Sequence, residues 1–157
     1  MQEYALSLLL FTPLLAALIG LFLPAAAISA FRYLTLITNF LQVLFLIMIL
    51  RSYDPAQGLQ FVEQKPWITL SLGSWGTLQA EYFLGLDGLS LPLVVLTVFV
   101  MLIATVSSWK IIENVKGYFI LLLILNAAII GSFTALDFLL FYLFFEFMLL
   151  HMFFLIA

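Results

Sequence analysis

The chain has 157 residues, of which 66% are hydrophobic and 8% are charged, and its formal net charge is −3. Soluble domains carry about 25% charged residues, so this composition excludes an ordinary soluble protein and indicates a membrane protein. At ~20 residues per membrane-spanning helix, the chain has room for about five such helices.

The residue counts also exclude several kinds of site. The chain has no cysteine, which rules out disulfides, thiolate metal sites and Fe–S ligation. Its single histidine, His151, cannot alone form a bis-histidine haem site or a zinc cluster. The five Lys and Arg residues form no basic patch, so nucleic acid is not an expected partner. We therefore expect no metal, no cofactor and no soluble substrate on this chain.

The first apolar segment, about residues 4–23, is predicted to be a retained membrane helix. It is followed by Pro24-Ala-Ala-Ala, which resembles a signal-peptide cleavage site. A signal peptide needs a positively charged start, however, and Met1–Tyr4 contains Glu3 but no Lys or Arg. Pro13 lies inside the segment, which membrane helices tolerate when a neighbour satisfies the freed carbonyl.

The second helix is predicted at about residues 31–50 and is followed by a polar loop over residues 51–87. Two alternating runs around the Gly73-Ser74 turn predict a β-hairpin in this loop. The alternative is an irregular amphipathic loop resting on the membrane. Four aromatic residues of the loop suit the interfacial belt: Trp67, Trp75, Tyr82 and Phe83.

Three further helices are predicted at about residues 89–109, 118–133 and 136–157. The fourth helix contains Asn126, which we expect to hydrogen-bond across helices. A small-residue face beside it predicts close helix packing and comprises Ala127, Ala128, Gly131 and Ser132. The predicted fold is thus an all-α membrane protein with five transmembrane helices and one hairpin, forming a single membrane domain over residues 1–157.

Charge distribution predicts the orientation of the helices. With the N-terminus outside, the inner loops carry three basic residues, Arg32, Lys110 and Lys116. The outer loop carries two, Arg51 and Lys65, over a longer span. Because positive charge favours the cytoplasmic side, this count favours an outer N-terminus.

The start of the fifth helix carries a predicted cap. Thr134 is followed three residues later by Asp137, the pattern of a capping box. Asp137 also suits the positive end of the helix dipole. This structural role is sufficient to explain Asp137.

Glu146 is the acid that lies deepest within an apolar stretch, and it is the main candidate for function. It lies nine residues beyond Asp137, or about 13–14 Å deeper, on the opposite helix face. A carboxylate near the bilayer centre is costly and usually faces a bundle interior or a water-filled path. This position predicts ion or proton handling; the alternative is a neutral glutamic acid that only holds helices together.

Two other residues of the fifth helix are candidate participants. Tyr142 precedes Glu146 by four residues, so the two share a face and the phenol is placed to donate to the carboxyl. His151 follows Glu146 by five residues, about 140° around the helix, and suits packing better than a proton relay. No lysine lies inside a predicted span, so a cationic partner for Glu146 must come from elsewhere.

Three segments closely resemble the chain M family of antiporter-like membrane subunits in bacterial complex I, the proton-pumping NADH:quinone oxidoreductase. They are Pro66-Trp67-Ile68, Phe83-Leu-Gly-Leu-Asp-Gly-Leu-Ser-Leu-Pro-Leu-Val-Val-Leu-Thr97 and Phe141-Tyr-Leu-Phe-Phe-Glu-Phe-Met-Leu-Leu150. The resemblance covers essentially the whole chain in order. Related antiporter-like proteins share the last segment.

The resemblance implies a role and a larger fold. Glu146 matches a glutamate that is essential for proton translocation and is paired with a lysine on the seventh helix; a central lysine lies on the eighth. The family fold has about fourteen helices, so this chain is similar to an N-terminal portion. The family usually has proline where this chain has His151, and proline bends a helix that histidine need not bend.

The resemblance further implies a non-redox translocase subunit in the bacterial inner membrane, multi-pass, with a periplasmic N-terminus. FMN, Fe–S clusters, NADH and quinone are then expected on other subunits, and the partners are other membrane subunits and the lipid bilayer. Two alternatives remain: a subunit of a multi-subunit cation/proton antiporter, or a truncated, non-conducting membrane scaffold.

Overall fold

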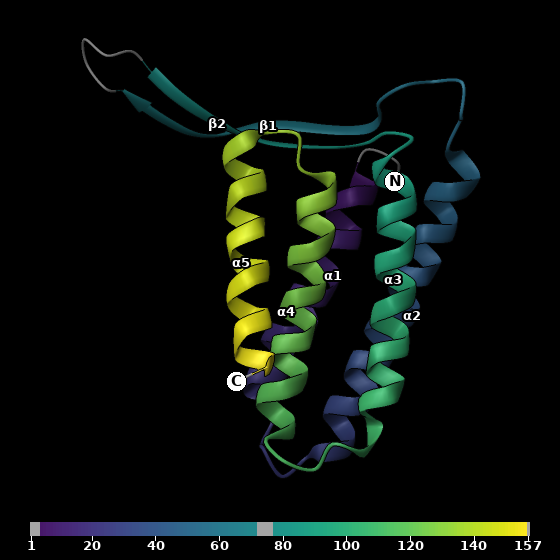
Figure 1. Ribbon diagram of the computed structural model, residues 1–157, viewed down its shortest axis with the longest axis vertical. Helices are drawn as coiled ribbons and strands as arrows, with labels where there is room; N and C mark the ends of the chain where they lie inside the picture. The colour runs from purple at the N-terminus through teal and green to yellow at the C-terminus, as the bar shows by residue number, and fades with distance from the viewer. Residues whose placement is uncertain (1–3, 72–76, 157) are drawn as a thin grey trace.

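The computed structural model describes residues 4–71 and 77–156 and consists of five long helices and a two-stranded antiparallel hairpin (Figure 1). All five helices are long and apolar enough to cross a membrane, which confirms the predicted fold class. The Gly73-Ser74 turn and Trp75 lie outside the described residues. The elements are α1 (Ala5–Phe22), α2 (Ile28–Ser52), β1 (Gln60–Ser71), β2 (Thr77–Leu86), α3 (Ser90–Ser107), the short 3-10 helix η3 (Ser108–Lys110), α4 (Val115–Thr134) and α5 (Phe138–Ile156).

Two helices begin about three residues earlier than predicted, because basic residues at their starts lie within the helix. Lys116 is in the first turn of α4, and its Nζ donates to the carbonyls of Leu21 and Leu23 at 2.8 and 2.9 Å. Arg32 is in the first turns of α2 and donates to the Ile111 carbonyl at 3.0 Å. Long basic side chains can lie along apolar surface and reach polar groups at its edge, so their charge does not end the helix.

Helix α4 is the centre of the bundle. In its membrane-spanning window 67% of the residues are buried, against 11% in α5. Figure 1 shows α5 at one side of α4, with α2 and α3 toward the other side. The fold therefore places one helix, α5, at the margin with most of its surface uncovered.

A proline in α1 creates the polar contact that joins α1 to α2. Pro13 lacks an N–H group, so the carbonyl of Leu9 has no helical partner. The side chain of Gln42 on α2 donates Nε2 to that carbonyl at 3.2 Å and is fully buried. The expectation that a neighbour satisfies the freed carbonyl is confirmed.

The Gln42 side chain also belongs to a buried hydrogen-bond network that reaches α4 and α3. Asn126 on α4 donates Nδ2 to the Gln42 side-chain oxygen at 2.7 Å and to that of Asn39 at 3.1 Å. Asn39 in turn donates to the Thr105 hydroxyl at 2.7 Å and to the Met101 carbonyl at 3.2 Å. The predicted cross-helix role of Asn126 is confirmed, and four helices meet in one network.

The hairpin covers the end of the bundle at which α1 begins. Gln60 pairs with Leu86 near one end of the ladder and Ser71 with Thr77 near the other. Glu63 on β1 is buried and accepts the backbone N–H groups of Leu6 and Ser7 at 2.8 and 3.1 Å. It therefore caps the first turn of α1 from a distant strand, where an anion also suits the helix dipole.

Strand β2 adds two further contacts between the hairpin and the helices. The Tyr82 hydroxyl lies 2.7 Å from the Ser7 hydroxyl, and burial, with a smaller effect from the nearby Glu63 carboxylate, raises the pKa of Tyr82. At the other side, the Leu136 N–H donates to the Phe83 carbonyl at 2.8 Å. The hairpin thus contacts the start of α1 and the connection between α4 and α5.

The segment that links β2 to α3 forms a reciprocal cap. The Asp87 carboxylate accepts the N–H groups of Leu89 and Ser90 at 3.0 and 2.7 Å, while the Ser90 hydroxyl accepts the Asp87 N–H at 2.9 Å. These hydrogen bonds lower the pKa of Asp87. The Gly-Leu-Asp-Gly-Leu-Ser motif therefore encodes the start of α3.

We expect Gln42→Leu to destabilise the protein by about 1–2 kcal/mol, because it leaves the Leu9 carbonyl and an Asn126 donor without partners. In the Pro13→Ala background the Leu9 carbonyl regains a helical donor, so the same substitution should cost less. Denaturant unfolding of the four variants in detergent micelles measures this coupling. Equal costs in the two backgrounds would show that the Leu9 contact is unimportant.

We expect Asp87→Ala to cost about 0.5–2 kcal/mol near neutral pH, since it removes the α3 cap. The folded-state pKa of Asp87 is depressed, so its stabilisation is present above the unfolded value of about 4 and is lost as pH falls through the folded value. Asp87→Asn keeps an acceptor but cannot titrate. The stability difference between wild type and Asp87→Asn should therefore shrink in acid, as measured by unfolding at several pH values.

Candidate functional site

Helix α5, which carries the candidate residues, is capped differently from the prediction. Asp137 is the N-terminal cap, and its carboxylate accepts the Leu140 N–H at 3.0 Å. Thr134 is not part of this cap, because it is the last residue of α4 and its hydroxyl donates to the Ile130 carbonyl at 2.9 Å. The following residues are extended, since Ala135 bridges to Leu84 on β2, and this separates Thr134 from the start of α5.

Close packing against α4 fixes the rotation of α5. A β-carbon at Gly131 would lie only 2.5 Å from the ring of Phe144, so glycine lets that ring sit directly on the α4 backbone. Ala127 and Ala128 on α4 are also buried. The predicted close packing of this small-residue face is confirmed at Gly131.

Glu146 faces away from this contact. At ~100° per residue it lies about 200° around the helix from Phe144, and it is exposed. It is eight residues from the start of α5, or about 12 Å along a helix roughly 28 Å long. The carboxyl therefore lies near the middle of the span, on the uncovered side of the chain.

Tyr142 shares the uncovered side with Glu146. It lies one helical turn before Glu146, and its ring is also exposed. Sequence spacing predicted that the two residues share a helix face, and both are exposed on this side of α5. Both project where no other described element of the chain covers them.

His151 lies on the opposite side of α5 and is buried. Its Nδ1 donates to the Phe147 carbonyl at 2.7 Å, and its ring stacks on that of Phe147 at 5.8 Å. The helix continues past it without a break to Ile156. The structure does not bring His151 together with Glu146, which agrees with the predicted packing role.

The lysines of the chain are remote from Glu146. Lys110 and Lys116 are at the ends of α3 and α4 opposite the hairpin, and Lys65 is on β1 with its ammonium 4.6 Å from the ring centre of Tyr4. Among the described residues, no group of three His, Asp or Glu side chains is arranged to hold a metal ion. Within the described part of the chain, the site is thus a carboxyl and a phenol without a cation.

The uncovered face of α5 surrounds this pair with large apolar side chains. Exposed examples are Phe141, Phe145, Leu149, Leu150 and Phe153. A mid-span ionisable group almost always faces a bundle interior or a water-filled cavity. Glu146 therefore lies on an apolar surface that no other described element of the chain covers.

Comparison with known proteins agrees with the motif resemblance. The chain is 39% identical over 162 aligned residues to NADH-quinone oxidoreductase subunit M of Rhodobacter capsulatus, covering 99% of this chain and 30% of that protein. It is 33% identical to NADH-ubiquinone oxidoreductase chain 4 of Arabidopsis thaliana, covering 98% and 30% of the two chains. It is 32% identical to F(420)H(2) dehydrogenase subunit M of Methanosarcina mazei, covering 96% and 29%. This chain is a homologue of those subunits.

The similarity to subunit M and chain 4 covers nearly all of this chain but only part of those proteins. No protein-family profile matches the chain. The chain spans about 30% of the length of the curated relatives it matches. The matched part carries the Asp87–Ser90 cap and the Glu146 segment, the same residues on which the resemblance rests.

We expect Gly131→Ala to destabilise the packing of α4 on α5, because its methyl group would overlap the Phe144 ring. The cost should be about 1–3 kcal/mol. Phe144→Ala in the same chain should recover part of it by removing the overlap. Denaturant unfolding in detergent measures both effects, with Gly58→Ala in an open part of the loop as the control. A neutral Gly131→Ala variant would contradict the packing account.

Proposed function

We propose that this chain is part of a proton-translocating membrane subunit of a respiratory NADH:quinone oxidoreductase, with Glu146 as the proton-exchanging carboxyl. The observation that carries the proposal is the position of Glu146: mid-span, beside Tyr142, on the side of α5 that the described chain leaves uncovered. A carboxyl in that place is retained for a polar partner or path rather than for contact with lipid.

The names of the relatives support a role apart from electron transfer. Two of the relatives belong to NADH-linked oxidoreductases and one to an F(420)H(2) dehydrogenase, yet similarity to this chain extends over nearly all of its length in each. Different electron donors therefore accompany the same membrane segment. The chain also lacks cysteine, so it supplies no Fe–S ligands. We infer that redox chemistry belongs to other subunits, which are its partners.

The chemistry available to Glu146 is proton exchange controlled by a neighbouring charge. A desolvated carboxyl favours the neutral, protonated form, and a cation brought close favours the ionised form. No lysine or arginine among the described residues lies near Glu146, so we propose that a cation on another helix of the assembled complex controls it. Tyr142, one turn earlier on the same side of α5, is placed to donate its hydroxyl to this carboxyl.

We propose that the hairpin end faces the periplasm and the opposite end the cytoplasm of a bacterial cell. Arg32, Lys110 and Lys116 all lie at the end opposite the hairpin. Arg51 and Lys65 lie at the hairpin end, where they share the surface with acidic residues. The positive-inside tendency then places the N-terminus outside.

We expect Glu146→Gln in the full-length protein to abolish coupled proton pumping, because the amide cannot exchange a proton. Glu146→Asp should retain part of it, and Tyr142→Phe should reduce it less than Glu146→Gln does. The measurement is proton uptake by vesicles that contain the assembled complex, with NADH oxidation and subunit content recorded in parallel.

Other outcomes would indicate a different function for this chain. Normal pumping by a fully assembled Glu146→Gln variant would reject the proton-site role and favour a scaffold. Cation-linked proton exchange in vesicles without NADH or quinone would instead identify a cation/proton antiporter. Asn39→Leu is a useful control, since it perturbs the buried network and should lower assembly rather than pumping per assembled complex.

A further inference from the structure

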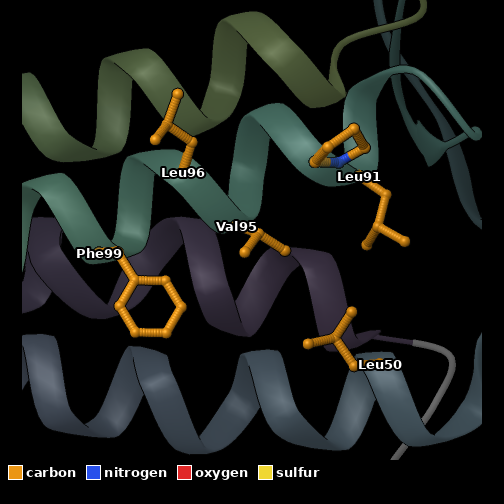
Figure 2. Close-up of a pocket in the computed structure, with 6 residues that line it drawn as sticks. Leu50, Leu91, Val95, Leu96 and Phe99 are labelled. Atoms are coloured by element: carbon orange, nitrogen blue, oxygen red, sulfur yellow. The ribbon is translucent and has the colours of Figure 1, made fainter.

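An apolar groove lies between α2 and α3 on the part of the bundle remote from Glu146. Figure 2 shows Leu91, Val95 and Phe99 on α3 pointing toward α2, from which Leu50 points back. The groove has a volume of about 620 Å³, within the range of about 300–1,000 Å³ typical of small-molecule sites. All its lining side chains are apolar: Leu50, Leu91, Pro92, Val95, Leu96 and Phe99.

The depth of the groove matches one leaflet of a bilayer. Leu91 is in the first turn of α3 and Phe99 is at the middle of that helix. The eight residues between them correspond to ~12 Å along the helix axis. Half of the hydrocarbon thickness is about 15 Å. The groove therefore runs from the membrane interface at the hairpin end to the bilayer midplane, which is the path of a single acyl chain.

Charged residues of both signs lie at the two helix ends that border the groove. Arg51 is exposed on the last turn of α2, directly after the lining residue Leu50, and no carboxylate pairs with it among the described residues. Asp87 is exposed at the start of α3. The two helix ends adjoin, since the Tyr53 hydroxyl comes within 3.7 Å of the place that a Gly88 β-carbon would take.

We propose that this groove is a specific site for one zwitterionic glycerophospholipid with an ammonium headgroup. One acyl chain lies between α2 and α3, the phosphate is held by Arg51, and the ammonium faces Asp87. An anionic lipid fits less well, because two acids, Asp54 and Asp87, lie next to the ends of α2 and α3 against the single Arg51. The inference does not depend on the role of Glu146.

The test uses the full-length protein purified in mild detergent, delipidated and titrated with phosphatidylethanolamine or phosphatidylglycerol. Native mass spectrometry counts the lipids retained. We expect one phosphatidylethanolamine to be retained, with at least about tenfold weaker retention of phosphatidylglycerol. Arg51→Gln should weaken retention by about tenfold, the loss of one charge-assisted contact, and Arg51→Lys should keep most of it.

A second variant tests the groove itself. Val95→Trp should fill it and displace the acyl chain, whereas Ile103→Trp, on the same helix one turn beyond Phe99, should leave retention unchanged. Arg51 is exposed, so Arg51→Gln keeps the test valid if Val95→Trp fails to fold. Equal retention of both lipids, unchanged retention in Arg51→Gln, or a groove filled by a protein helix in the assembled complex would each overturn the proposal.

Discussion

The hydrogen bond from Gln42 to the Leu9 carbonyl is the contact on which the arrangement of the helices depends. Inside a membrane the apolar side chains gain little by leaving lipid, so polar contacts and close packing decide which helices meet. Pro13 leaves the Leu9 carbonyl without a helical donor, and the Gln42 side chain supplies one. The side-chain oxygen of Gln42 then accepts a hydrogen bond from Asn126. The contact with Asn126 places α4 against α1 and α2, and the buried position of α4 follows from it.

The position of α4 determines in turn what α5 can present. Because Gly131 has no side chain, the Phe144 ring lies on the α4 backbone, and this contact favours the observed rotation of α5. That rotation buries His151 and turns Tyr142 and Glu146 outward. The proposed proton site thus faces outward because of a glycine on the neighbouring helix, although neither Gly131 nor Phe144 takes part in proton exchange.

Local signals in the sequence were sufficient for the helices and for the residues that share a helix face. Continuous apolar runs predicted five spans, Pro13 predicted an external partner for a carbonyl, and four-residue spacing predicted the Tyr142–Glu146 pair. Contacts between distant segments were not predictable in the same way. Glu63 caps a helix 57 residues away, which no local pattern encodes. The sequence analysis assigned no role to Asn39 and Gln42. Two amides three residues apart in an apolar span nevertheless indicate a polar helix face.

The cap on α1 also sets an order of events during synthesis. The N–H groups of Leu6 and Ser7 receive their carboxylate only after Glu63 has been translated and β1 has reached the membrane surface. At roughly 5–20 residues per second, the first turn of α1 waits several seconds for its partner. Until then it relies on water at the interface. The α1 cap is therefore complete only when the hairpin is in place, so the fold of α1 depends on the loop between α2 and α3.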